Sequence, residues 1–397
     1  MSFEVKDMIL SCFPRRLSRQ VRELYFSSLI LVFAESLIAI FEPVFLFLFF
    51  SGRGASLPIA LMQVIIFYLA IYVLYFFTIP LGAKFAKHFG YEYSMSLSSV
   101  FVVLIYLGFI LMKTWFWPAI ILSIVSYTLA KLFYWPAYHA NFARFSDCSE
   151  RGREISNLGV LQSIGGIIAP VIGGFILKFY SFPVLFVLAA VLILLSNIPM
   201  LRTKEKFEPT KFSYFGAYKF LFSKAKRRKF FSLWGYGEEF IAIVIWPIFI
   251  YVVVKDFLDL GALTAVSLFA TTLIFLFIGR LTDSQDGRSI LRLGTWFYFF
   301  SWLVRLFTRT VPGIFTVDVY SRLGKQALSV PITAMTYSKA MEKDSSTMGT
   351  ILFFEMSLVA GKIIAMIACL LLLQFFAFSW NPLFVLAGLM SLLYLLF

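Results

Sequence analysis

Long apolar runs separated by short polar segments organise the whole chain. Each run holds about 20 residues, the length at which an α-helix crosses a bilayer, and the runs are continuously apolar, which disfavours a β-barrel. The pattern predicts an all-α membrane protein. Because the last run is short, an eleven-span chain is the alternative to the twelve expected spans, which are residues 24–50, 58–80, 93–112, 118–140, 155–177, 183–201, 230–254, 261–279, 290–308, 313–337, 347–373 and 381–397.

The longest polar stretch, Arg202–Lys229, divides these spans into two groups of six. We therefore predict an N-terminal six-helix bundle at 1–201, a basic cytoplasmic linker at 202–229 and a C-terminal six-helix bundle at 230–397. The middle of the linker, Phe212–Phe222, interleaves aromatic and polar residues. It is either a solvated connection or an amphipathic helix on the inner leaflet.

Composition agrees with this pattern, since 60% of the residues are hydrophobic and 14% are charged, which excludes a water-soluble globular protein. The net charge of +14 reflects topology rather than nucleic-acid binding, because the expected external loops hold only five of the 35 Lys and Arg residues. This bias predicts that both termini are cytoplasmic. We expect a multi-pass protein of the plasma membrane, the cell membrane of a prokaryote, whose basic segments contact anionic lipid.

An acidic residue precedes a proline by eight positions in each half of the chain, at Glu35 and Glu239. A charged side chain within a membrane costs about 2.5–3.5 kcal/mol on insertion scales, so a repeated one indicates a function. A lysine also precedes a proline in spans four and ten, at Lys131 and Lys325. Two matches in the same order indicate a duplicated chain, and duplicated membrane proteins with polar groups at the repeat interface are typically transporters.

The segment after span eight contains Gly279, Asp283, Gly287 and Arg288. With one inserted residue, it is similar to the loop signature Gly-x-Leu-x-Asp-x-x-Gly-Arg of the major facilitator superfamily, whose members have two pseudo-symmetric six-helix bundles joined by a long cytoplasmic loop. The corresponding segment after span two keeps its glycines and basic character but has no aspartate. The resemblance implies a conformational gate formed by these four residues, with Gly82 and Gly90 at the corresponding positions of the first half.

Span five resembles the glycine-and-proline motif of the family's antiporters. Small residues at this spacing let helices approach closely and bend. The motif therefore either favours exchange over uniport or serves helix packing alone. Its residues are Gly165, Gly166, Pro170, Gly173 and Gly174.

In the resembled family, helices one, four, seven and ten line the central path. This arrangement would put Glu35, Lys131, Glu239 and Lys325 around one cavity, with an acid and a base from each half. Burial favours the protonated form of a carboxyl and a nearby lysine favours the ionised form, which gives a physical basis for proton coupling. Static ion pairs that hold the helices together are the alternative. Further candidates for the cavity are Glu42, Arg322 and Glu355.

Aromatic side chains surround Lys131 on span four and form the expected substrate wall, which suits an organic molecule or a cation. The wall consists of Tyr127, Tyr134, Trp135 and Tyr138, with Trp246 from span seven.

Several polar side chains have two interpretations. Arg322 either binds an anionic group or pairs with Asp318, one helical turn earlier. Glu355 and Lys362 share a face of span eleven and are expected to pair across helices. We expect Glu238 to make a helix-end or neighbour contact and His139 to have an ordinary interfacial role.

These features predict a secondary active transporter that moves a small organic solute by alternating access, with proton coupling and with antiport or efflux slightly favoured. A symporter or an uncoupled facilitator of the same fold is the alternative. An intramembrane enzyme would need a clustered His/Asp or paired-Asp site, which the sequence does not display. With two histidines, no cysteine cluster and no phosphate-binding loop, we expect no metal, no cofactor and no ATP-driven step. We expect a monomer that binds its solute and no nucleic acid.

Overall fold

The computed structural model describes residues 19–147, 150–200, 213–284, 287–342 and 346–397. Within these ranges every regular element is a helix, which confirms the predicted fold class. The first half contains α2 (Arg19–Ser36), α3 (Phe41–Ser51), α4 (Leu57–Phe89), α5 (Tyr91–Leu111), α6 (Phe116–Phe145), α7 (Arg151–Phe179) and α8 (Phe182–Met200).

The second half begins with an interrupted helical segment and continues with long helices. The segment consists of α10 (Arg227–Leu233), α11 (Gly237–Phe240) and α12 (Trp246–Val254), joined by a 3₁₀ turn at Trp234–Tyr236 and a π-helical turn at Ile241–Ile245. It is followed by α13 (Phe257–Ser284), α14 (Gly287–Arg305), α15 (Val311–Ala340), α16 (Thr347–Phe375) and α17 (Asn381–Leu392), and a 3₁₀ turn at Leu393–Leu396.

Seven helices in the described part of the chain are long and apolar enough to cross a membrane, and three shorter apolar helices accompany them. Two of the expected spans, α14 and α15, belong to neither group. Polar residues explain this, because α14 carries three arginines and α15 carries Asp318, Arg322 and Lys325 near its middle. Every expected span overlaps a helix, but the number of twelve spans stays a prediction.

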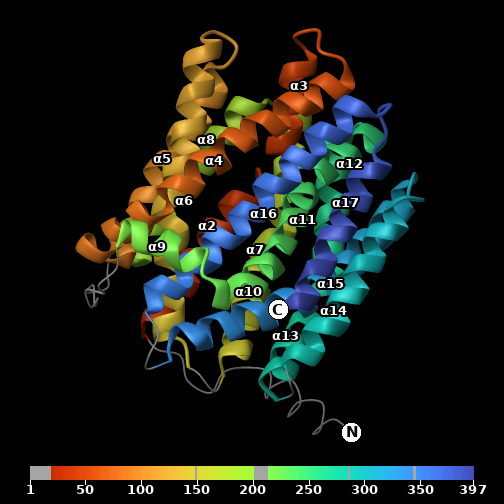
Figure 1. Cartoon of the computed structure of the whole chain (residues 1–397). Helices are drawn as coiled ribbons and strands as arrows, with labels where there is room; N and C mark the ends of the chain where they lie inside the picture. The colour runs from red at the N-terminus through yellow and green to blue at the C-terminus, as the bar shows by residue number, and fades with distance from the viewer. Residues whose placement is uncertain (1–18, 148–149, 201–212, 285–286, 343–345) are drawn as a thin grey trace, which may run out of the picture.

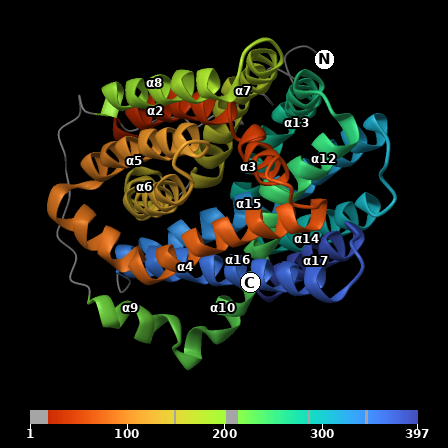
Figure 2. The ribbon, with the colours of Figure 1, turned by 90° about the horizontal axis from the view of Figure 1, so that it is seen from above.

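The two halves stand side by side, as Figures 1 and 2 show from two directions. Two helix pairs make the principal contacts between them, α4 with α16 and α7 with α13. The linker region contains a short helix, α9 (Tyr214–Leu221), which rests on α4 through the Tyr214 hydroxyl, a donor to the Phe77 carbonyl at 2.8 Å. The described middle of the linker is therefore helical, whereas its place on the inner leaflet stays a prediction.

The backbone is irregular directly after both repeated acidic residues. In the first half, α2 ends at Ser36 and turns occupy residues 37–40 before α3 begins. In the second half, the π-helical turn begins two residues after Glu239. Proline explains both sites, since Pro43 and Pro247 have no N–H to donate to the carbonyl four residues earlier. The repeat recognised in the sequence is thus also a repeat of interrupted helices.

Small residues of α7 allow it to pack between α2 and α13. A methyl group at Gly173 would overlap the Leu37 carbonyl of the turn after α2, whereas one at Gly174 would overlap the Phe257 carbonyl of α13. A methyl group at Gly165 would come within 3.2 Å of the Leu29 side chain, and one at Gly166 within 3.2 Å of the Ser36 hydroxyl. Pro170 lies within the helix, with Gly261 packed against its carbonyl.

The expected gate segment is mostly helical rather than a loop. Helix α13 extends through Ser284, and Gly287 and the exposed Arg288 open α14. The side chain of Asp283 lies outside the described residues, and so do the surroundings of Gly279. In the first half, Gly82 contacts the Leu132 backbone closely, and Gly90 ends α4 with φ of 97°, a conformation that favours glycine.

Candidate functional site

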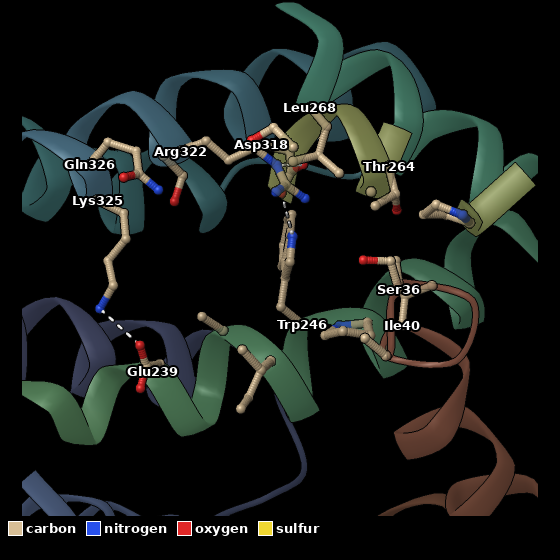
Figure 3. Close-up of a pocket in the computed structure, with 18 of the residues that line it drawn as sticks. Ser36, Ile40, Glu239, Trp246, Thr264, Leu268, Asp318, Arg322, Lys325 and Gln326 are labelled. Carbon is tan, nitrogen blue, oxygen red and sulfur yellow. Dashed lines mark hydrogen bonds and ion pairs between the residues drawn. The ribbon is translucent and has the colours of Figure 1, made fainter. Parts of the chain in front are cut away.

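A cavity of about 550 Å³ lies between the two halves, within the usual range for sites that bind small molecules. Figure 3 shows it from inside, with Glu239 and Lys325 facing each other and Trp246 directed towards Asp318. The first half contributes residues of α2, of the turn after it and of α7, all of them uncharged: Val32, Ser36, Ala39, Ile40, Gly159, Gln162, Ser163, Gly166 and Pro170. The charged lining comes from the second half: Glu239, Arg305, Asp318, Arg322 and Lys325.

Glu239 joins three helices at the cavity wall. Its carboxylate lies 2.5 Å from Lys362 Nζ of α16 and 3.5 Å from Lys325 Nζ of α15. The expected acid–base pair of the second half is therefore present. Lys362 is an additional partner that the sequence did not assign to Glu239.

Glu238 is fully buried beside this cluster, although we expected only a helix-end or neighbour contact. Its carboxylate lies 2.5 Å from Lys325 Nζ, and it accepts hydrogen bonds from the hydroxyls of Tyr298 at 2.5 Å and Tyr394 at 3.2 Å. Lys325 therefore neutralises two adjacent carboxylates, and Lys362 supplies the second positive charge.

A second polar cluster lies along the same wall. Arg322 Nε donates to Asp318 Oδ2 at 2.8 Å, and Trp246 Nε1 lies 3.3 Å from Asp318 Oδ1. The guanidinium of Arg305, on α14, lies 4.2 Å from the Trp246 ring centre. Of the two interpretations of Arg322, the pair with Asp318 is present, and the half-buried Arg322 still lines the cavity.

The acid and base of the first half form a separate cluster. Lys131 Nζ lies over the rings of Tyr72 at 4.9 Å and Tyr127 at 5.3 Å. Glu42 is buried and accepts a hydrogen bond from Tyr68 at 2.7 Å. Glu35 is exposed, and the charges that act on it are those of Lys131 and Glu42.

The structure thus does not place all four repeated charges around one cavity. Glu239 and Lys325 line the central cavity, whereas Glu35 and Lys131 are not among its lining residues. Tyr72 connects the two clusters, because its ring also lies 5.5 Å from Lys362 Nζ. A lysine of the first half and a lysine of the second half therefore meet at a tyrosine of α4.

The expected aromatic wall is divided between different surroundings. Trp246 lines the central cavity. Tyr138 lines a smaller cavity of about 160 Å³, which shares Gly159, Gln162, Gln326 and Ser329 with the central one. Tyr134 stacks on Tyr138 and Trp135 is partly exposed. Tyr127 belongs to the cluster around Lys131.

Glu355 joins the two halves on the expected cytoplasmic side of the cavity. His139 Nε2 of α6 lies 2.9 Å from Glu355 Oε1 of α16, and the Tyr75 hydroxyl of α4 donates to Glu355 Oε2 at 3.2 Å. His139 Nδ1 also lies 2.5 Å from the Tyr337 hydroxyl of α15. Glu355 and Lys362 both pair across helices, as expected, but with different partners. His139 takes part in a buried contact between the halves rather than in an ordinary interfacial role.

Sequence reasoning did not assign Arg305, Glu238, Lys362 and His139 to these clusters. A signal was available for Arg305 and Lys362, since a charge inside an apolar span rarely faces lipid. For Glu238 the available signal was its position beside Glu239 in an apolar segment. For His139 no signal distinguished a buried partner from a residue at the membrane surface.

The family model described as Major Facilitator Superfamily matches residues 24–254 of the chain. Among curated proteins, the uncharacterized protein YqgE of Bacillus subtilis (strain 168) is 22% identical over 224 residues. That match covers 54% of this chain and 52% of YqgE, so the chain spans about half the length of this relative.

Solved transporter structures share the fold over nearly the whole chain. The D-xylose-proton symporter superposes with a TM-score of 0.69 at 12% identity, covering 95% of this chain and 96% of that one. The human organic anion transporter MFSD10 superposes with a TM-score of 0.66 at 15% identity, and the match covers 94% of this chain and 99% of that one. The E. coli fucose:proton symporter FucP superposes with a TM-score of 0.65 at 14% identity, and the match covers 95% of this chain and 96% of that one. At these identities the similarity is one of fold.

Proposed function

Because this chain belongs to the Major Facilitator Superfamily, we propose that it is a secondary active transporter that moves a small organic solute across the membrane by alternating access. The observation that carries the proposal is the cavity of about 550 Å³ between the two halves, to which both halves contribute. A site at such an interface changes its accessibility when one half rocks against the other. The transporters of similar fold, which move sugars with protons or organic anions, agree with a solute of this kind.

We propose Glu35 as the residue that carries the coupling proton. A carrier must be able to gain and lose its proton, and Glu35 is exposed at the surface of the chain whereas Glu42 is buried and bonded to Tyr68. Glu239 already forms ion pairs with two lysines, so it is the more constrained of the two repeated carboxylates. No hydrogen bond or ion pair ties the Glu35 carboxylate to a residue in the described part of the chain. Its position at a helix interruption allows its surroundings to change as the halves move.

Exchange of solute for protons is the direction we favour, on the glycine-and-proline motif of α7. Its residues pack against both α2 and α13, so α7 is shared by the two halves. A proton symporter of the same fold is the alternative, as is an uncoupled facilitator. The family and the fold neighbours favour transport over an intramembrane enzyme.

The test is transport in proteoliposomes under an imposed pH gradient. We expect Glu35→Gln to lose gradient-driven accumulation while it retains at least part of the solute exchange at equal pH, because the amide cannot carry a proton. Glu342→Gln, a change at an exposed carboxylate outside the cavity, is the control and should behave as the wild type. Gradient-driven transport by Glu35→Gln at the wild-type rate would refute its role. Solute movement that never responds to pH would indicate the uncoupled facilitator.

A further inference from the structure

Arg305 is a buried cation whose hydrogen-bonding capacity is mostly unused. Its side chain is 2% exposed and lines the central cavity. Nη2 donates to Ser321 Oγ at 2.8 Å, whereas Nε and Nη1 have no hydrogen-bond partner among the described residues. A guanidinium keeps its charge in proteins, so loss of a proton cannot relieve this burial. Two donor nitrogens and a full charge at the cavity wall are therefore left unsatisfied by the protein itself.

The surroundings of Arg305 hold it in place, and although the charges of Asp318 and Glu238 act on it, no carboxylate in the described part of the chain forms an ion pair with it. Its guanidinium carbon lies 3.8 Å from the Trp302 ring centre and 4.2 Å from that of Trp246, so two indole rings fix its position. The neighbouring carboxylate, Asp318, is engaged by Arg322 and by the Trp246 indole. Rigid placement of a planar donor group is what bidentate recognition of an anion requires.

Among the described residues, the charges that line the cavity and their direct ion-pair partners do not balance. Glu239 is paired with Lys362, Glu238 with Lys325, and Asp318 with Arg322. Arg305 is the positive charge that remains after these pairs are formed. An unpaired buried charge is strongly unfavourable, so a site that retains one is suited to a ligand of the opposite charge.

The opposite wall of the cavity has a different character. All lining residues from α2, its following turn and α7 are uncharged, and most of them are apolar or glycine. A ligand that satisfies both walls has an anionic group at one end and an apolar body at the other. A neutral sugar would leave the Arg305 charge unpaired, and an organic cation would be repelled by it.

We propose that the solute is an amphiphilic organic anion, whose carboxylate, sulfonate or phosphate binds the free N–H groups of Arg305 while its apolar body rests against α2 and α7. The inference rests on the proposed transport function and specifies its substrate class. Arg322 and Lys325, which are half-buried on the same wall, add positive potential around the anionic group.

Binding of matched aromatic probes to the purified full chain tests the inference. Naphthoate, naphthalenesulfonate and naphthyl phosphate carry the anionic group on one apolar body, and naphthamide is their neutral counterpart. In vesicles of neutral phosphatidylcholine, we expect at least one anion to bind and to quench tryptophan fluorescence, with naphthamide binding about tenfold or more weakly. Arg305→Gln should weaken anion binding to the level of naphthamide. Arg305→Lys, which keeps the charge but loses the planar fork, should give an intermediate affinity.

Arg309→Gln is the matched control, because Arg309 is exposed, lies one turn further along and bonds to Thr308 and Asn381 instead. It should leave anion binding unchanged. Equal binding of naphthoate and naphthamide, undiminished anion binding by Arg305→Gln, or failure of all three anions would overturn the inference. Arg305-dependent binding of an anionic lipid alone, measured with phosphatidylglycerol in place of the probes, would also overturn it.

Counterflow with neutral, cationic and anionic solutes separates this inference from the proposed function. If only neutral or cationic solutes move, the proposed transport function stands and the anion site is refuted. If anions bind at Arg305 but no solute shows counterflow, the anion site stands and the proposed transport function is refuted.

Discussion

Lys325 is the side chain on which the buried charges of the second half depend most. It neutralises Glu238, which is fully buried, and also approaches Glu239. Lys325→Met would leave Glu238 with hydrogen bonds from tyrosines alone, whereas Glu239 would keep Lys362. We expect a loss of about 3–5 kcal/mol in the free energy of unfolding, measured by denaturation in mixed micelles.

Two further variants give this prediction its controls. The double variant Lys325→Met with Glu238→Gln should recover most of the loss, because it removes the unpaired carboxylate together with its partner. Lys339→Met removes a lysine from the same helix whose partner, Glu342, is exposed, so it should cost less than about 1 kcal/mol. A Lys325→Met protein as stable as Lys339→Met would show that Glu238 is not held as a charged group.

The ion pair between Lys178 and Asp256 joins the halves on the expected outer side, at a distance of 3.2 Å. The backbone N–H of Asp259 and the Lys178 ammonium group lower the pKa of Asp256 below its usual value. A lowered folded-state pKa stabilises the protein above the pKa of the unfolded chain, about 4, and this contribution is lost as the pH falls through the folded value.

We therefore expect Asp256→Asn to melt at a lower temperature than the wild type at pH 7, and the difference to disappear in strong acid. Thermal unfolding in detergent across this pH range measures it. Asp259→Asn, which keeps the backbone N–H that bonds to Asp256, is the control and should melt at the wild-type temperature at pH 7. A difference for Asp256→Asn that persists in strong acid would contradict the assignment.

At the scale of residues, the sequence predicted the types of charged group more reliably than their partners. Glu239 with Lys325 followed from the repeat, but the pairing of Lys362 with Glu239 depends on how α16 is rotated about its axis. Nearly uniform apolar spans carry little periodic contrast, so the sequence does not specify that rotation. Arg305 was recognisable as a charge within a span, but only the structure shows that its neighbour Asp318 is already engaged.

At the scale of helices, α7 is in close contact with both halves through adjacent glycines. Alanine normally stabilises a helix by up to about 1 kcal/mol relative to glycine, but a methyl group at Gly173 would overlap the Leu37 carbonyl. We expect Gly173→Ala to lower the free energy of unfolding by about 1–3 kcal/mol, the usual effect of overpacking. Unfolding in mixed micelles measures it.

Gly287→Ala is the comparison, because the atom nearest to a methyl group at Gly287 would be 3.8 Å away. It should be neutral or stabilising. If Gly173→Ala were equally neutral, α2 and α7 would not be held at this separation. The helix boundaries show the limits of sequence reading at this scale. The gate segment has loop-forming residues, yet α13 continues through Ser284, and the interruption after Ser36 was not predicted because Pro43 lies several residues beyond it.

At the scale of the whole molecule, the contact between His139 and Glu355 holds the halves together beside the smaller cavity. His139→Gln should weaken this contact and shift the population towards the form that is open on the expected cytoplasmic side. The usual scale of such coupling is about 1–3 kcal/mol. The measurement is labelling of Thr333→Cys, which lines the smaller cavity, in an otherwise cysteine-free chain.

His88→Gln changes the only other histidine of the chain, which is exposed near the end of α4, and should not alter the labelling rate. Unchanged labelling in His139→Gln would mean that this contact does not control access. The arrangement of the two halves followed from the hydropathy pattern and the repeat. The contacts that close the cavity could not be predicted from the sequence, because they join residues that lie far apart in it.

The unpaired Arg305 also has an electrical consequence. With the solute absent, the cavity and its immediate partners hold four cations, Arg305, Arg322, Lys325 and Lys362, against the carboxylates of Glu238, Glu239 and Asp318. A bound monoanion would cancel the excess charge, so the membrane voltage would act on the empty protein and hardly on the loaded one. A full elementary charge gains about 2.3 kcal/mol per 100 mV across the membrane. A potential that is negative inside would therefore draw the empty site towards the cytoplasm and favour binding of the solute from that side.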